Sequence, residues 1–278
     1  MHYLPLPTDA AATVLTVCIE NYRDKDLKAR LKAASDLITA AEEAYRLAGQ
    51  TKTLHTVPTA TAVGGVSADE MEAVYDNKLV PKQEAGRRYY DKLRNGARGE
   101  KCPFCGQLPV SSLDHYLPKS KYPALAVTPI NLVPSCFDCN FVKKALGPLT
   151  ATEQLLHPYF DDVEKTPWLT GTVIEGVPPT IKFKAQPSAG FEPRLASRVV
   201  FHFETLDLNR IYAAEAANEL SGIEWRYARL RKLGGPNAVR TQLLDDWESR
   251  RAHRVNSWQT AFYKALADSG WYCETVGT

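Results

Sequence analysis

The sequence lacks any apolar run close to the roughly 20 residues that a membrane-spanning helix requires. Its first segment, MHYLPLPTDAAATVLTVCIENY, also lacks the charged n-region and the apolar h-region of a secretory signal. Internal repeats of fixed period are absent as well. We therefore expect a cytoplasmic protein that makes no membrane contact.

The net charge of the chain is also small, but charged residues of the two signs are unevenly distributed along it. The formal net charge is only +2, although residues 82–144 contain eleven Lys or Arg and five Asp or Glu. A basic segment of this kind suits a polyanion. Taken alone, it is explained equally well by a solvated surface rich in arginine. The 278 residues, 44% of them hydrophobic, are enough for one large domain or two modest ones.

The cysteine spacing is not that of a disulfide framework, because four of the six cysteines form two C-x-x-C pairs. These pairs are Cys102 with Cys105 and Cys136 with Cys139. Tetrahedral zinc takes four thiolates, and each pair supplies two of them from one tight turn. We predict a structural zinc in a closed shell, which leaves no position for a catalytic water. Cys18 and Cys273 lie in apolar or aromatic surroundings and are interpreted as buried small side chains.

Helical periodicity dominates both ends of the chain. We expect two helices within residues 8–48, a helix capped by Ser67, and a helix that ends near Arg94. Short strand-like pieces around residues 102–112 and a helix over residues 137–146 follow. Three strands are predicted over GTVIEGV, TIKFKAQ and RVVFHFETL. The chain then returns to long helices, with a break predicted at Gly234-Gly235-Pro236.

These patterns predict a mostly helical α+β protein with three regions. Residues 1–98 form an N-terminal helical region, and residues 99–160 form a small zinc-binding module. Residues 161–278 form a C-terminal region in which short strands precede long helices.

Thirty residues lie between the two cysteine pairs, more than the roughly 15 to 20 of a simple zinc ribbon. They include Asp114-His115 at an expected strand end and Asn131 in NLVPSC, while Asn140 directly follows the last cysteine of the second pair. This layout of LDHYLPKS, NLVPSC and CNFVKK resembles the HNH family of nucleases over residues 100–160. The resemblance implies a ββα-metal fold for the module at residues 99–160.

The residues fit phosphodiester hydrolysis on chemical grounds too. That reaction needs a divalent cation to neutralise the phosphate and a base to deprotonate water. Asp114 and Asn140 offer hard oxygen ligands suited to Mg²⁺ or Mn²⁺, and His115 has an ordinary pKa near neutrality. An isolated Asp-His dipeptide would usually be a polar pair at a turn, so the surrounding motif carries the prediction.

The resemblance implies a role for each of four positions. Asp114 matches the metal-binding residue and His115 the general base. Asn131 matches the asparagine that pins the long hairpin loop and orients the histidine. Asn140 matches the final ligand on the helix, a position where the family often has histidine. This departure leaves the choice between Mg²⁺ and Mn²⁺ open.

Several cations near this motif are candidate phosphate contacts, which would position nucleic acid without reading its sequence. They are Lys119, Lys121, Lys143, Lys144, Arg87 and Arg88. For each of them an ordinary solvated charge is an equally good interpretation. His157 is either an additional ligand or a histidine packed near Tyr159 and Phe160, and we favour the packing role.

The resemblance implies a metal-dependent endonuclease that hydrolyses DNA and leaves 5′ phosphate and 3′ hydroxyl ends. Similar HNH proteins occur in prokaryotic restriction and anti-phage defence systems, some of which pair the nuclease with an ATPase subunit. One alternative is a nucleic-acid-binding zinc module without catalysis, and another is a nuclease subunit that is inactive until a partner releases it. The sequence leaves open whether the substrate is DNA or RNA, and whether the cut is a nick or a double-strand break.

Overall fold

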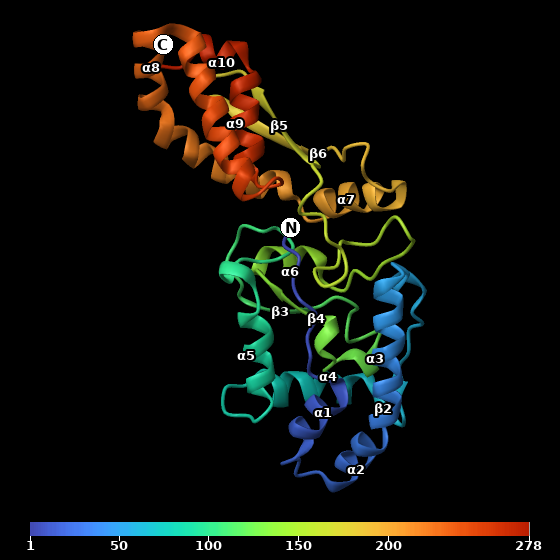
Figure 1. Ribbon diagram of the computed structural model, residues 1–278. Helices are drawn as coiled ribbons and strands as arrows, with labels where there is room; N and C mark the ends of the chain where they lie inside the picture. The colour runs from blue at the N-terminus through green and yellow to red at the C-terminus, as the bar shows by residue number, and fades with distance from the viewer. Residues whose placement is uncertain (278) are drawn as a thin grey trace. The chain divides into compact units, whose positions relative to one another are not determined.

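A computed structural model describes residues 1–277, and these divide into two units, residues 1–162 and a second unit that begins at Val163. Both units combine helices with small antiparallel sheets (Figure 1). The mostly helical α+β fold class is therefore confirmed. The first unit contains the residues of both the expected helical region and the expected zinc-binding module.

The first unit is built from short helices and two hairpin-like sheets. Its helices are α1 (Ala11–Ile19), α2 (Lys25–Ala33), α3 (Ser35–Gln50), α4 (Ala68–Val74), α5 (Arg87–Asn95) and α6 (Phe137–Lys143). Its strands are β1 (Ala62–Val63), β2 (Val66–Ser67), β3 (Ser112–His115) and β4 (Leu132–Ser135). The shorter turns are η1 (Leu54–Thr56), the π-helical η2 (Tyr75–Leu79), η3 (Arg98–Glu100), η4 (Pro123–Leu125) and η5 (Pro129–Asn131).

Helix α4 begins where the sequence predicts, at the Ser67 cap. The Ser67 hydroxyl accepts a hydrogen bond from the backbone N–H of Glu70, and the Glu70 carboxylate accepts one from the Ser67 N–H. This capping box satisfies two backbone donors that a helix start otherwise leaves without partners. Arg30 of α2 binds the same carboxylate at 2.7 and 2.9 Å, so the start of α4 is also fixed to α2.

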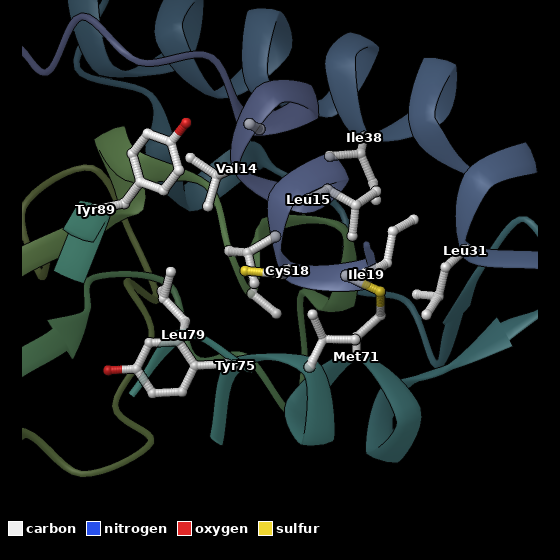
Figure 2. Close-up of a cluster of buried hydrophobic side chains, with 14 of the residues drawn as sticks. Val14, Leu15, Cys18, Ile19, Leu31, Ile38, Met71, Tyr75, Leu79 and Tyr89 are labelled. Atoms are coloured by element: carbon white, nitrogen blue, oxygen red, sulfur yellow. The ribbon is translucent and has the colours of Figure 1, made fainter. Parts of the chain in front are cut away.

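One hydrophobic core joins the N-terminal helices to the strands of the cysteine-rich segment. Figure 2 shows Leu15 and Cys18 of α1 packed among Ile38 and Met71. The same cluster includes Leu113 of β3 and Leu132 of β4, as well as Ala126 and Val127 of the intervening loop. Burial of this apolar surface against α1 and α4 therefore holds β3 and β4 in place.

The second unit pairs one hairpin with long helices. It contains β5 (Leu169–Ile174), β6 (Thr180–Ala185), α7 (Pro193–Thr205), α8 (Leu208–His253), α9 (Trp258–Asp268) and α10 (Gly270–Thr275). The strands pair antiparallel from Leu169 opposite Ala185 to Ile174 opposite Thr180. Asn256 accepts hydrogen bonds from the backbone N–H groups of Trp168 and Leu169, so it fixes the start of β5.

Two of the three strands predicted for the C-terminal region are confirmed, and the third is wrong. The segment RVVFHFETL belongs to helix α7, where Arg198, Val199, His202 and Phe203 are buried at a helical spacing. Glu192 caps this helix by accepting hydrogen bonds from the backbone N–H groups of residues 194 and 195, and Pro193 occupies its first position. The predicted break in α8 occurs at Gly235, whose φ of 71° is not helical.

Among the described residues, no helix is both long and apolar enough to cross a bilayer.

Candidate metal and catalytic site

The first cysteine pair lies in a tight turn. The Cys102 carbonyl accepts a hydrogen bond from Gly106 N–H at 2.6 Å, and Gly106 has a φ of 68°, which favours glycine. The backbone N–H of Leu108 donates to the Cys105 sulfur at 3.4 Å. Backbone N–H groups directed at a sulfur stabilise its thiolate form, which is the form that binds metal.

The second pair caps helix α6. Cys136 is the N-cap residue, and its sulfur accepts a hydrogen bond from the Cys139 N–H at 3.4 Å. All four cysteines are buried, and their sulfur atoms lie within 4.8 Å of one another. A tetrahedral zinc with Zn–S bonds of about 2.3 Å needs sulfurs about 3.8 Å apart, and Cys105 and Cys136 are 4.0 Å apart. The four thiols can therefore bind a metal such as zinc.

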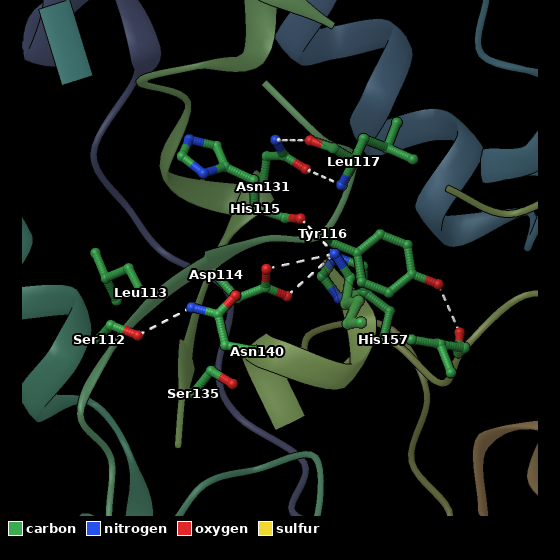
Figure 3. A network of polar contacts seen from close by, with 12 residues as sticks. Ser112, Leu113, Asp114, His115, Tyr116, Leu117, Asn131, Ser135, Asn140 and His157 are labelled. Carbon is green, nitrogen blue, oxygen red and sulfur yellow. Dashed lines mark hydrogen bonds and ion pairs between the residues drawn. The ribbon is translucent and has the colours of Figure 1, made fainter. Parts of the chain in front are cut away.

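Strands β3 and β4 bring the polar residues of the motif together. They pair antiparallel, with Asp114 opposite Val133 and His115 opposite Leu132. Helix α6 starts directly after β4, and its residues Asn140 and Lys143 reach back to β3. Figure 3 shows Asp114, Asn140 and Ser112 side by side at this junction.

The Asp114 carboxylate is buried, with 4% of the residue exposed. The Lys143 ammonium nitrogen lies 3.1 Å from its Oδ2 and 3.4 Å from its Oδ1, and it also donates to the His115 carbonyl at 2.6 Å. Burial raises the pKa of Asp114, and the positive charge of Lys143 opposes that shift. Each carboxylate oxygen has two lone-pair positions, so Lys143 does not use all of the acceptor capacity of Asp114.

His115 is held in one orientation by its Nε2 atom, which lies 2.8 Å from the Ala126 carbonyl oxygen. A carbonyl only accepts, so Nε2 carries the proton and Nδ1 is left as the basic nitrogen of the neutral ring. The Tyr75 ring meets the imidazole edge-on, with centroids 4.4 Å apart. Burial lowers the pKa of His115 to about 3, so the ring is neutral near pH 7 but is a weaker base than the near-neutral pKa expected from the sequence.

Asn131 braces the loop between the strands. Its Oδ1 accepts from the Leu117 N–H at 2.8 Å, and its Nδ2 donates to the carbonyls of Leu117 and Leu125 at 3.0 and 3.2 Å. The Leu125 carbonyl lies one residue before Ala126, which contacts His115. Asn131 therefore braces the loop that contains the carbonyl bound by His115.

Asn140 is tied to β3 through its amide nitrogen, which donates to the Ser112 hydroxyl at 3.1 Å. This bond fixes the orientation of the amide and leaves its oxygen as a possible ligand. Hard oxygen donors from Asp114 and Asn140 suit Mg²⁺ or Mn²⁺.

A pocket of about 380 Å³ lies over these residues. Asp114, His115 and Asn140 line it from the cysteine-rich segment, while Glu72 and Asp76 line it from α4 and η2. The acidic residues belong to the helical region and were not predicted as part of the site. Their spacing, with Tyr75 between them, places all three on one helix face, but nothing in the sequence connects that face to Asp114.

Lys119 also lines the pocket, and it is already paired there. Its ammonium nitrogen lies 2.6 Å from Asp76 Oδ2 and 3.5 Å from Glu72 Oε2, and 5.0 Å from the centre of the Tyr75 ring. The two carboxylates reduce the positive charge that Lys119 can present to a phosphate.

The other candidate phosphate contacts have different environments. Lys144 lines the pocket and is exposed, and Lys121 is exposed. Lys143 is buried against Asp114, so the expectation that its ammonium meets a phosphate does not hold. Arg87 binds Asp91 at 2.9 Å, and the guanidinium of the exposed Arg88 stacks over Tyr89.

His157 is fully buried and does not line this pocket. Its Nε2 lies 2.8 Å from the Tyr45 hydroxyl, and its Nδ1 accepts from the Tyr159 N–H at 3.1 Å. The ring also meets Phe160 edge-on, with centroids 4.7 Å apart. Both ring nitrogens therefore have hydrogen-bond partners, and the ring packs against Tyr159 and Phe160, as expected from the favoured interpretation.

Comparison with known proteins adds one relative. Protein ea31 of Escherichia phage lambda is 29% identical over 290 residues, covering 97% of this chain and 98% of the phage protein. Its name states no activity. No family model matches the chain, and no solved structure matches it. The similarity to the phage protein thus spans nearly the whole chain and assigns no function.

Proposed function

We propose that this protein is a metal-dependent HNH endonuclease that hydrolyses DNA phosphodiester bonds. The observation that carries the proposal is the placement of Asp114, His115 and Asn140 around one pocket, on a β3–β4–α6 segment that is clasped by four cysteines. Hydrolysis of a phosphodiester needs metal ligands, which Asp114 and Asn140 can supply, and a base, which His115 can supply.

Asp114 and Asn140 would hold a Mg²⁺ or Mn²⁺ ion, which when bound neutralises the phosphate and stabilises the leaving 3′ oxygen. His115 accepts the proton of the attacking water at Nδ1, because its Nε2 proton is held by the Ala126 carbonyl. Asn131 fixes the loop that orients His115. The four cysteines would bind a structural zinc that keeps α6 against β3.

Plasmid cleavage tests this proposal. The full chain is incubated with supercoiled plasmid in Mg²⁺, in Mn²⁺ and in buffer without added divalent metal, and an RNA substrate is run in parallel. We expect metal-dependent cleavage that falls by a factor of about 10² to 10⁴ in His115→Ala, the usual contribution of a general base. His253→Ala is the matched control, because His253 is an exposed residue of α8 in the second unit. Equal cleavage by wild type and His115→Ala would exclude His115 as the base.

A nucleic-acid-binding module without catalysis is the second candidate. It is favoured by the contact of Lys143 with both oxygens of Asp114, since a cation bound there competes with a divalent metal. This candidate predicts DNA binding that is independent of divalent ions, with no cleavage in Mg²⁺ or Mn²⁺.

A protein partner is a further part of the proposal. By analogy with HNH subunits of anti-phage defence systems, the nuclease would be restrained or activated by an ATPase-type subunit. Copurification from the native host followed by mass measurement tests this, and a monomer with full activity argues against it.

A further inference from the structure

Helix α6 carries two phenyl rings on its surface. Phe137 is 70% exposed and Phe141 is 57% exposed, although both belong to a helix of seven residues. The rings are stacked, with centroids 5.7 Å apart and planes 18° from parallel. The Lys144 ammonium lies 4.7 Å from the centre of the Phe141 ring.

The core does not explain these rings. The buried positions of α6 are Cys139, in the four-cysteine cluster, and Lys143, which pairs with Asp114. The helix is therefore anchored through the face that carries Cys139 and Lys143, and the two phenyl rings are not needed for its packing. Two large aromatic side chains that stay in water beside each other are typical of a surface that binds a partner.

The position of the rings relative to the pocket indicates the kind of partner. Phe137 lies three and four residues before Asn140 and Phe141, so these three residues share one side of the helix. Lys144 directly follows the last helical residue, and its ammonium lies beside the Phe141 ring. Asn140 and Lys144 line the pocket that contains Asp114 and His115. The rings therefore flank the residues that would face the scissile phosphate.

We propose that Phe137 and Phe141 are a stacking platform for unpaired bases of the nucleic-acid substrate, next to the phosphate that is cleaved. This inference rests on the proposed nuclease function and names its substrate class. Every base presents an aromatic face, so stacking on the two rings tolerates any sequence. Lys144, beside the rings and exposed, supplies the positive charge that complements the adjacent backbone phosphate.

The platform favours single-stranded or locally opened nucleic acid. Bases within an intact duplex are stacked on their neighbours and present only their edges in the grooves. A ring that stacks on a base face must therefore meet a base outside the stack, as in single strands, loops or flipped nucleotides.

Oligonucleotide binding tests the platform separately from cleavage. The full chain is titrated, in buffer without added Mg²⁺ or Mn²⁺, into a single-stranded DNA oligonucleotide that carries one 2-aminopurine, and fluorescence quenching and anisotropy are both recorded. The same oligonucleotide is then measured as a duplex. The variants are Phe137→Leu, Phe141→Leu and the double variant, because leucine keeps an apolar surface and removes the aromatic face.

We expect wild type to quench 2-aminopurine and to bind the single strand more tightly than the duplex. Each leucine substitution should weaken single-strand binding by about tenfold, in keeping with alanine substitutions at stacked bases, and the double variant should lose the quenching. Trp225→Leu is the matched control, since Trp225 is 71% exposed on α8 with the Arg229 guanidinium over its ring. It should bind like wild type. Zinc content and melting temperature check that the leucine variants are folded.

The outcomes separate the two proposals. If quenching depends on the phenyl rings but no nucleic acid is cleaved in any divalent ion, the platform stands and the nuclease fails. If wild type cleaves DNA while the double leucine variant binds and quenches as wild type does, the nuclease stands and the platform is overturned. A wild-type chain that self-associates, with a double variant that does not and with unchanged oligonucleotide binding, would show a protein interface and also overturn the platform.

Discussion

The ammonium nitrogen of Lys143 lies 3.1 Å from Oδ2 and 3.4 Å from Oδ1 of Asp114, with both side chains inside the protein. The two residues come from α6 and β3, so this ion pair links the helix to the strand that carries the proposed ligand and base. It also sets the charge that a divalent metal would meet at Asp114.

Replacing Lys143 by methionine should destabilise the protein by about 3 kcal/mol, because it leaves a buried carboxylate without its partner. The double variant Lys143→Met with Asp114→Asn should recover part of that loss, since it removes both charges. Urea unfolding of the single and double variants, with zinc present, measures the coupling. A single variant that unfolds like wild type would show that the pair contributes little to stability.

The four-cysteine cluster gives a prediction that does not depend on catalysis. Cys139→Ser should reduce bound zinc from one ion per chain to none and lower the melting temperature, because three thiolates hold zinc much less tightly than four. Cys273→Ser is the control, since Cys273 is equally buried but lies outside the cluster, in α10. Metal analysis of the purified variants gives the answer, and full zinc occupancy in Cys139→Ser would contradict the assignment.

The spacing of residues along the chain predicted the features that depend on local geometry. The two C-x-x-C pairs predicted the cysteine cluster, and Ser67 with Glu70 predicted the start of α4. The segment RVVFHFETL was mistaken for a strand because a short run of valine and phenylalanine fits either periodicity. Pro193, a residue type favoured at the first position of a helix, was the available start signal.

Contacts between distant segments could not be predicted in the same way. Lys143 and Lys144 were both expected to meet phosphates because they lie three and four residues after Asn140 on one helix. However, α6 ends at Lys143 and Lys144 has a φ of 44°, so the two side chains diverge. Glu72 and Asp76 reach the pocket only because α4 and η2 pack beside β3. The roles of Asp114, His115, Asn131 and Asn140 remain predictions that the geometry accommodates.

The capping box of α4 should make stability depend on acid pH. Hydrogen bonds from Arg30 and from the Ser67 backbone lower the pKa of Glu70 from 4.5 to about 2. A lowered pKa means that the contribution of Glu70 is fully present above about pH 4.5 and is lost as the pH falls towards 2. In urea unfolding, Glu70→Gln should therefore be less stable than wild type at pH 6, and the difference should shrink below pH 4.5. Protonation of the zinc ligands affects both proteins alike, so the difference isolates Glu70. A constant difference across this range would show that the charge of Glu70 is not involved.

Lys144 and Lys119 line the same pocket but should contribute unequally to nucleic-acid binding. Lys119 is neutralised by Asp76 and Glu72, whereas Lys144 is exposed and lies over the Phe141 ring. A lysine that contacts one phosphate adds about 0.7 to the slope of log affinity against log salt for a single strand. Lys144→Ala should therefore reduce this slope by about 0.7, while Lys119→Ala should leave it nearly unchanged. Anisotropy titrations at several salt concentrations measure both slopes. A larger loss in Lys119→Ala would mean that nucleic acid displaces the two carboxylates and takes Lys119 as its own partner.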